Sequence, residues 1–257
     1  MEALELVAPP EEDRSETVDL AALNADLDGA TAEEVVEWAA KHFGERLVMT
    51  SSFGAHSALM LHLASRVVPN IQVIFLDTGY LFPETYQFAE DLRRRFKVRL
   101  EVFSPAMTAA RMEALHGRLY NGDEEELARY QQVVKVEPMA RALRELDAAA
   151  WLAGLRSNQT SFRAGLRRVV KQNGILKVHP ILGWSREDVD RYFERHDLPF
   201  HPLYRWGYRS IGDAHSTVPV DPEEMDDRAG RRLGEKRECG IHLPDAETAA
   251  SLKSSGL

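Results

Sequence analysis

The chain has 257 residues, of which 44% are hydrophobic, enough for one substantial core with appended segments. Its 32 lysines and arginines are outnumbered by 41 acidic residues, so the formal net charge is −9. Nucleic acid and anionic membranes would repel such a surface, and we expect neither as a partner. An anionic ligand would have to be held by locally clustered cations.

The two ends of the chain lack the periodicity of packed elements. Residues 1–18 are acidic and contain proline, and we predict that they are disordered. This segment lacks the basic start and apolar core of a signal peptide, and no stretch of the sequence is apolar enough to span a bilayer. We therefore expect a cytoplasmic protein. Residues 19–220 are predicted to form one α/β domain, and residues 221–257 a mobile C-terminal tail.

Between these ends, short apolar runs alternate with segments of helical period. A helix is predicted over 20–27, and a second from the capping box of Thr31 and Glu34 to Gly44. The strand candidates are 46–52, 71–76, 98–103, 149–155 and 176–180. The other helix candidates are 57–65, 83–96, 123–146 and a helix capped by Ser185. Pro138 should interrupt the third of these or start a second helix there. This alternation predicts the α/β class, with a doubly wound, mainly parallel sheet flanked by helices.

Three of the predicted strands end in loops of small and polar residues, at 50–54, 76–79 and 154–156. In an open α/β sheet, ligands bind at the carboxyl ends of the strands, near helix N-termini. Small residues there let backbone amides approach a phosphate or an adenine closely. The same pattern also fits ordinary turns, and the sequence contains no P-loop, Rossmann glycine fingerprint or zincin helix.

Two arginines, Arg156 and Arg163, lie seven residues apart in a hydroxyl-rich loop after the fourth predicted strand. Arginine stays charged and binds phosphate with two parallel hydrogen bonds, which suits a multiply phosphorylated nucleotide. The alternative is a surface loop with ordinary ion pairs.

The only cysteine of the chain, Cys239, lies in the cationic segment 236–242. Nearby cations lower the pKa of a thiol and favour the reactive thiolate, although Glu238 acts against them. The alternative is an inert, buried cysteine. A single cysteine excludes an internal disulfide and any all-cysteine metal site within one chain.

The segment 238–242, Glu-Cys-Gly-Ile-His, resembles the signature of the adenylylsulfate and phosphoadenylylsulfate (PAPS) reductases of sulfate assimilation. Further segments agree in the family's order: 51–54, 76–85, 135–139, 154–156, 180–184 and 210–213. The match extends over about residues 30–245. The resemblance implies an adenine-nucleotide α-hydrolase-like fold, and hence a nucleotide-binding domain.

The resemblance also implies a mechanism. The Cys239 thiolate would attack the sulfur of the substrate, displace adenosine phosphate and keep an S-sulfocysteine. A dithiol protein, thioredoxin or glutaredoxin, would then release sulfite as the co-substrate. One cysteine cannot resolve its own adduct, which explains the need for an external reductant.

The family's functional residues can be carried over by position. Lys135 and His242 would act with Cys239 in catalysis. Ser51, Ser52 and Gly54 match the nucleotide loop, and Leu76, Asp77, Thr78 and Gly79 match the adenosine-binding segment. Arg156 and Arg163 would face phosphates, and Arg228 and Arg231 match tail arginines that close over the substrate.

Relatives that reduce adenylylsulfate commonly bind a four-iron cluster through two cysteine pairs. Here 130–134 contains no cysteine, and Asp213 and Ser216 occupy the second pair's positions. A cluster needs four protein ligands, so we expect no metal and no iron–sulfur cofactor. This pattern resembles the cluster-free reductases, which mostly use PAPS. A cluster-free adenylylsulfate reductase remains an alternative.

Two other functions compete with reduction. An ATP-dependent adenylyl transferase or thiolase of this fold would need an aspartate where the chain has Ala55 and His56. A non-catalytic nucleotide sensor would keep the pocket without the nucleophile. Among the histidines, His179, His201 and His215 could shape turns or bind substrate. Relatives are commonly oligomeric, so this chain could also form a homo-oligomer.

Overall fold

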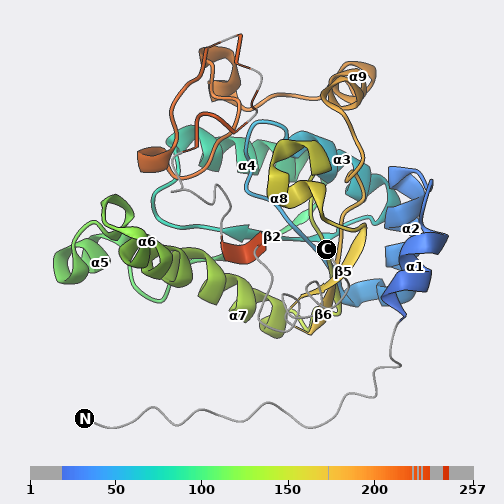
Figure 1. The fold of residues 1–257 in the computed structure, drawn as a ribbon, viewed down its shortest axis with the longest axis horizontal. Coiled ribbons are helices and arrows are strands. Elements are labelled where there is room, and N and C mark those ends of the chain that lie inside the picture. Colours follow the sequence, from blue (N-terminus) through green and yellow to red (C-terminus); the bar gives the residue numbers. More distant parts are fainter. Residues whose placement is uncertain are drawn as a thin grey trace, which may run out of the picture.

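The computed structural model describes residues 19–172, 174–221, 223–224, 226, 228–231 and 240–242. The predicted disorder of 1–18 and most of the predicted tail, Cys239 included, lie outside this range. Figure 1 shows a central sheet with helices above and below it. Within the described residues, no helix is long and apolar enough to cross a membrane.

The sheet has six strands in the order β3-β2-β1-β4-β6-β5. Their bounds are Leu47–Thr50 (β1), Gln72–Leu76 (β2), Arg99–Phe103 (β3), Ala150–Leu152 (β4), Val169–Gln172 (β5) and Ile175–Val178 (β6). All neighbouring pairs are parallel except β5 with β6, so the predicted fold class is confirmed. Strand β5 is not predicted from the sequence, because four residues at a sheet edge give too little alternation to reveal a strand.

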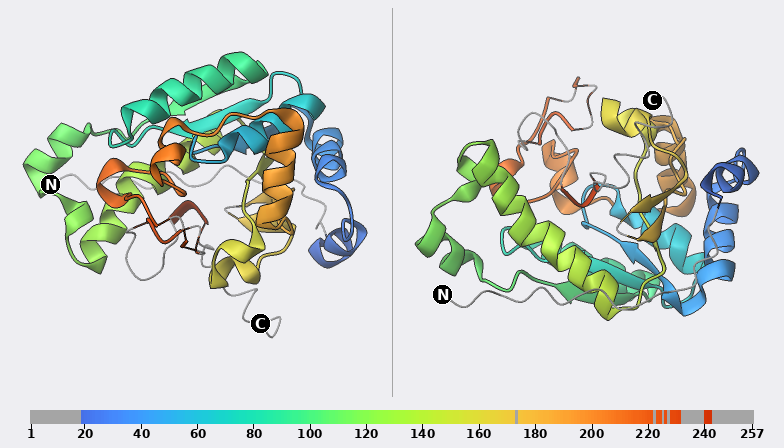
Figure 2. Two further views of the ribbon diagram at one scale, coloured as in Figure 1. Left: turned by 90° about the horizontal axis from the view of Figure 1, so that it is seen from above. Right: turned by 60° about the horizontal axis from the view of Figure 1, so that its bottom comes forward.

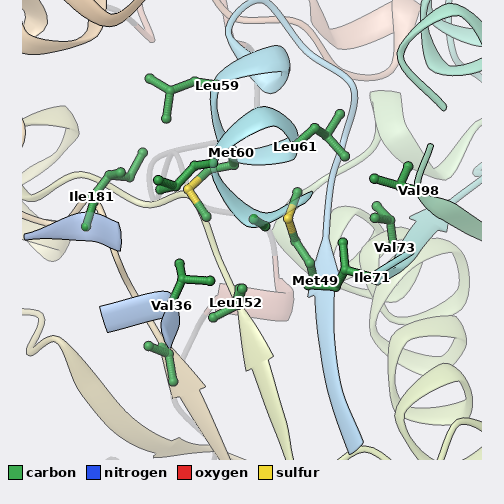
Figure 3. Close-up of a cluster of buried hydrophobic side chains, with 14 of the residues drawn as sticks. Val36, Met49, Leu59, Met60, Leu61, Ile71, Val73, Val98, Leu152 and Ile181 are labelled. Atoms are coloured by element: carbon green, nitrogen blue, oxygen red, sulfur yellow. The ribbon is translucent and has the colours of Figure 1, made fainter. Parts of the chain in front are cut away.

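One face of the sheet packs against α2 (Ala32–Phe43), α3 (Ser57–Val67), α4 (Pro83–Phe96) and α9 (Arg186–His196). Side chains alternate along a strand, so Leu47 and Met49 point to this face and Val48 to the other. Figure 3 shows Met49 and Leu152 on neighbouring strands beneath α3, with the Met49 side chain extending toward the helix. The capping box predicted at the start of α2 is present. Helix α1 (Leu20–Asp26) lies against the edge strand β5.

The opposite face is covered by α7 (Glu137–Glu145), which packs on Val48, Ile74 and Trp151. Figures 1 and 2 show α6 (Glu124–Gln131) and α7 as one long run on this side. The predicted interruption at Pro138 is confirmed, since a π-helical turn, η3 (Gln132–Val136), joins the two helices just before this proline. The remaining elements are short: α5 (Ala109–His116), α8 (Ser161–Ala164), η1 (Gly44–Arg46), η2 (Leu119–Asn121), η4 (Ser157–Gln159), η5 (Pro202–Trp206), η6 (Ala214–Ser216) and η7 (Gly240–His242).

Candidate active site

A cavity of about 270 Å³ opens at the carboxyl ends of β1, β2 and β4. The loops that follow these strands form one side of it, as expected for a parallel α/β sheet. Segments distant in sequence complete the lining: Lys135 from η3, residues 209–213, Arg228, Arg231 and the turn that ends at His242. The structure therefore brings most of the predicted site residues together.

The loop after β1 supplies Ser51, Ser52 and Gly54 to the cavity. The Ser51 hydroxyl accepts a hydrogen bond from the amide of Phe53, which folds the loop back on itself. At Gly54, an added Cβ would lie 3.2 Å from the carbonyl oxygen of Ile211, so a larger residue would push this segment away. Helix α3 begins three residues later, and its positive end favours an anion at this loop.

Some residues of the loop after β2 line the cavity, and others stabilise the turn that the loop makes. Leu76 and Thr78 line the cavity, whereas Asp77 and Gly79 do not. The Asp77 carboxylate accepts hydrogen bonds from the Tyr86 hydroxyl at 2.7 Å and from the amide of Gly79 at 2.9 Å. Asp77 thus stabilises the loop conformation, and Gly79 adopts a positive φ of 77° within it.

Arg156 and Arg163 both line the cavity and are both 4% exposed. The side-chain oxygen of Gln159 accepts hydrogen bonds from the Arg156 amide and from the Arg163 guanidinium. This glutamine, which the sequence analysis did not single out, holds the two ends of the loop together. Such burial does not fit the alternative of an exposed loop with ordinary surface ion pairs.

Lys135 and Asp213 form a buried ion pair on the cavity wall, with Lys135 Nζ 2.5 Å from Asp213 Oδ2. The Thr78 hydroxyl donates a second hydrogen bond, at 2.7 Å, to Asp213 Oδ1. Burial alone would raise the pKa of Asp213, but the Lys135 ammonium and the two hydrogen bonds lower it to about 2. From the sequence alone, Asp213 is only a vacated cysteine position, and the pairing with Lys135 is not predicted.

Three further arginines line the cavity: Arg209, Arg228 and Arg231. Arg231 pairs with Thr217 in an isolated β-bridge, and its guanidinium lies against Gly212. Arg209 is not among the site residues predicted from the sequence, although it directly precedes the 210–213 segment. With Lys135, Arg156 and Arg163, six basic side chains line the cavity, and Asp213 is the one carboxylate among its described lining residues.

The turn η7 lies on the α7 face of the sheet and contributes Ile241 and His242 to the cavity. The Gly240 amide donates to the side-chain oxygen of Gln131 at 2.9 Å. Burial and the charges of Lys177 and Arg163 hold the pKa of His242 well below its usual value, so the imidazole is neutral at neutral pH. Cys239 directly precedes this turn in sequence and lies outside the described residues.

His179, His201 and His215 do not line the cavity. His179 donates to the carbonyl of Arg167, and His201 accepts from the Leu203 amide, so both shape turns. The ring of His215 stacks on Tyr120 with centroids 3.7 Å apart. In the part of the chain that the structure describes, no group of three histidine, cysteine or acidic side chains could hold a metal ion.

The fold and the cavity together define an α/β domain suited to binding a small polyanion. The family model for the phosphoadenosine phosphosulfate reductase domain matches residues 46–219. A curated relative from Synechocystis, named phosphoadenosine 5'-phosphosulfate reductase, is 50% identical and covers 93% of this chain and 97% of its own. A relative of the same name from Thiocapsa roseopersicina is 48% identical over 85% of this chain and 91% of its own.

Solved structures agree with these relatives. The phosphate complex of PAPS reductase from Candida auris superposes with a TM-score of 0.67 at 30% identity, over 77% of this chain and 95% of its own. An FMN adenylyltransferase from Candida glabrata, with a TM-score of 0.55 at 15% identity over 83% of this chain and 72% of its own, shares the fold. The chain belongs to the phosphoadenosine phosphosulfate reductase family and is an oxidoreductase.

Proposed function

We propose that this protein reduces PAPS to sulfite and adenosine 3',5'-bisphosphate in assimilatory sulfate reduction, acting in the cytoplasm with reduced thioredoxin. The observation that carries the proposal is the convergence of six cations on one cavity that also includes His242, three residues beyond the sole cysteine. The names of the relatives support PAPS as the substrate.

The charge of the cavity suits this substrate. PAPS carries a sulfate–phosphate anhydride at one end of its ribose and a phosphate at the other, and each anionic group needs its own cations. Arg156, Arg163, Arg228 and Arg231 are the proposed phosphate ligands. The β1 loop and the Leu76–Gly79 segment would hold the rest of the nucleotide, and Lys135 would face the sulfo group.

The proposed reaction has two displacement steps. In the first, the Cys239 thiolate attacks the sulfur of PAPS, an S–S bond forms, and the S–O bond breaks as adenosine 3',5'-bisphosphate leaves with the electron pair. In the second, a thioredoxin thiolate attacks Cys239 Sγ and sulfite leaves with the S–S electron pair. The second thioredoxin thiol resolves the mixed disulfide, which returns the Cys239 thiol and leaves oxidised thioredoxin.

The proposal needs no resident cofactor, because the thioredoxin dithiol supplies both electrons. The sequence supports this, since one cysteine per chain cannot provide the four ligands of an iron–sulfur cluster. The proposal therefore favours PAPS over adenylylsulfate, in keeping with cluster-free relatives.

Intact-mass spectrometry tests the first step. The full chain is mixed with PAPS or with adenylylsulfate, in the absence of thioredoxin. We expect a sulfonate adduct with PAPS, located at Cys239 by peptide mapping and missing in Cys239→Ser. An adduct formed preferentially with adenylylsulfate would overturn the substrate choice alone. No adduct with either nucleotide would contradict the mechanism and favour a nucleotide sensor.

The same sample tests the second step. Reduced thioredoxin should discharge the adduct and release one sulfite for each modified chain, whereas thioredoxin with both cysteines replaced by serine should not. Discharge by glutaredoxin but not by thioredoxin would change the reductant and leave the first step intact.

A further inference from the structure

The strand β6 carries a lysine, Lys177, that is 1% exposed and has no role in the mechanism described so far. Its ammonium lies 4.5 Å from the centroid of the Trp151 ring, on the neighbouring strand β4. It also donates to the side-chain oxygen of Gln172 at 3.0 Å and lies 3.0 Å from His242 Nδ1. Burial of an ammonium group is costly, and these contacts offset that cost.

The contact between Lys177 and His242 determines which ring nitrogen carries the proton. An ammonium group has three donors and no acceptor, so His242 Nδ1 must accept. In a neutral imidazole, the proton then resides on Nε2. His242 lines the cavity, so the ring offers a bound ligand an N–H donor rather than a lone pair.

Lys177 also acts on the residue before His242. The Gln172 oxygen accepts from Lys177, which orients the amide so that Gln172 Nε2 donates to the carbonyl of Ile241 at 3.1 Å. One buried lysine thereby fixes the backbone of the turn at Ile241 and the side chain at His242. Both residues follow Cys239 closely in the sequence.

We propose that Lys177 is a positioning residue that docks the turn η7 and holds His242 as an Nε2–H donor to an anionic oxygen of the bound substrate. This inference rests on the proposed function and refines the part that His242 plays in it. A histidine held in this way cannot deprotonate Cys239 through Nε2, because Nε2 has no lone pair to accept the proton. The Cys239 thiolate would then depend on the cations that flank it in the sequence instead.

Several charged or titratable groups face His242 and set the conditions of the test. Lys177 and His179 come from β6 and its end, Arg163 from α8, and Arg228 from the C-terminal segment. Removing Lys177 leaves the other groups in place, so a change in the His242 tautomer can be attributed to the lost contact.

The test uses the full chain with ¹⁵N-labelled histidine, free and bound to adenosine 3',5'-bisphosphate, with His242→Asn to assign the signals. The ring nitrogen shifts should report the Nε2–H tautomer in the wild-type protein. Lys177→Met should populate the Nδ1–H tautomer and slow adduct formation with PAPS by about tenfold or more. The dissociation constant of the bisphosphate should change much less. Lys177→Arg, which keeps a charged donor, should restore the tautomer and part of the rate.

An Nδ1–H tautomer or a charged imidazole in the wild-type protein would overturn the inference, even if Lys177→Met failed to fold. A wild-type rate and tautomer in Lys177→Met would also overturn it. Neither result bears on the proposed function, which fails instead if the wild-type protein forms no adduct at all.

Discussion

Lys135 Nζ lies 2.5 Å from Asp213 Oδ2, and this pair joins the π-helical turn η3 to the segment 209–213 of the cavity wall. A π-helical turn inserts an extra residue into the helical course and redirects the side chains on it, and such turns are often found at functional sites. Because Asp213 is wholly buried, its charge depends on Lys135 and Thr78 for compensation. The position of the Lys135 ammonium in the cavity is therefore coupled to the stability of the fold.

Replacing Lys135 alone by methionine should destabilise the protein more than replacing both Lys135 and Asp213 by uncharged residues. Lys135→Met leaves the Asp213 carboxylate buried without its main compensating charge, and we expect the free energy of unfolding to fall by about 3–5 kcal/mol. The double variant Lys135→Met/Asp213→Asn removes both charges and should recover most of that loss. Urea denaturation of the wild-type protein, both single variants and the double variant gives the coupling energy. If the losses in unfolding free energy of the two single variants simply add in the double variant, the ion pair contributes no coupling energy.

The same pair predicts how stability depends on pH. The pKa of Asp213 is lowered from its ordinary value of 3.8 to about 2 in the folded chain. A carboxyl with a depressed folded pKa contributes stability that is present above its unfolded pKa and is lost as the pH falls through the folded value. The Asp213 contribution should therefore disappear between about pH 4 and pH 2.

Comparison with Asp213→Asn isolates this contribution from those of the other carboxyls. The difference in unfolding free energy between wild type and Asp213→Asn should be constant at neutral pH and shrink across this acid range. A difference that stays constant down to pH 2 would contradict the lowered pKa.

Gly212 is predicted to be essential for the position of Arg231. An added Cβ would lie 2.2 Å from Nη1 of Arg231, and the guanidinium, as the end of a flexible side chain, would move out of the way. Gly212→Ala should therefore fold normally but weaken binding of adenosine 3',5'-bisphosphate by about tenfold, the cost of one charged hydrogen bond. Gly183→Ala is the matched control, because nothing lies within 4 Å of its Cβ. Titration calorimetry measures both, and equal affinities would remove Arg231 from the phosphate ligands.

Helix boundaries are predicted correctly where the residues that indicate them lie within one short segment. Pro83 opens α4 and the helix ends at Phe96, as predicted, because a first-turn proline and an apolar period lie within one short segment. Thr31 and Glu34 reveal the start of α2 for the same reason. These signals required no knowledge of the tertiary structure.

The residues whose roles were not predicted from the sequence are those that act through partners far away in the chain. Lys177 looks like an ordinary strand residue until the fold brings Trp151 and His242 to it. Arg209 has no partner signal in its own segment, and it contacts the Glu224 carbonyl only because the chain returns there. Asp77 fits the family's adenosine-binding segment, yet its hydrogen bonds to Tyr86 and Gly79 turn its carboxylate to the loop itself. No local pattern carries such information.

The docking of the turn η7 should depend on the absence of a side chain at Gly240. An added Cβ would lie 2.7 Å from Cγ2 of Val136, and a β-branched side chain in a helical turn cannot easily move. Gly240→Ala should therefore displace the turn and slow the formation of the Cys239 adduct with PAPS by about tenfold or more, since small misplacements of reacting groups are costly. The dissociation constant of adenosine 3',5'-bisphosphate should change much less.

The double variant Gly240→Ala/Val136→Ala tests this explanation, because the second substitution removes the methyl group that obstructs the first. It should restore much of the rate of adduct formation, as followed by intact mass over time, while Val136→Ala alone should stay close to wild type. A double variant as slow as Gly240→Ala would mean that the loss has another origin, such as the backbone conformation at residue 240. A full recovery would tie the reactivity of Cys239 to the contact between its neighbour in sequence and the turn that carries Lys135.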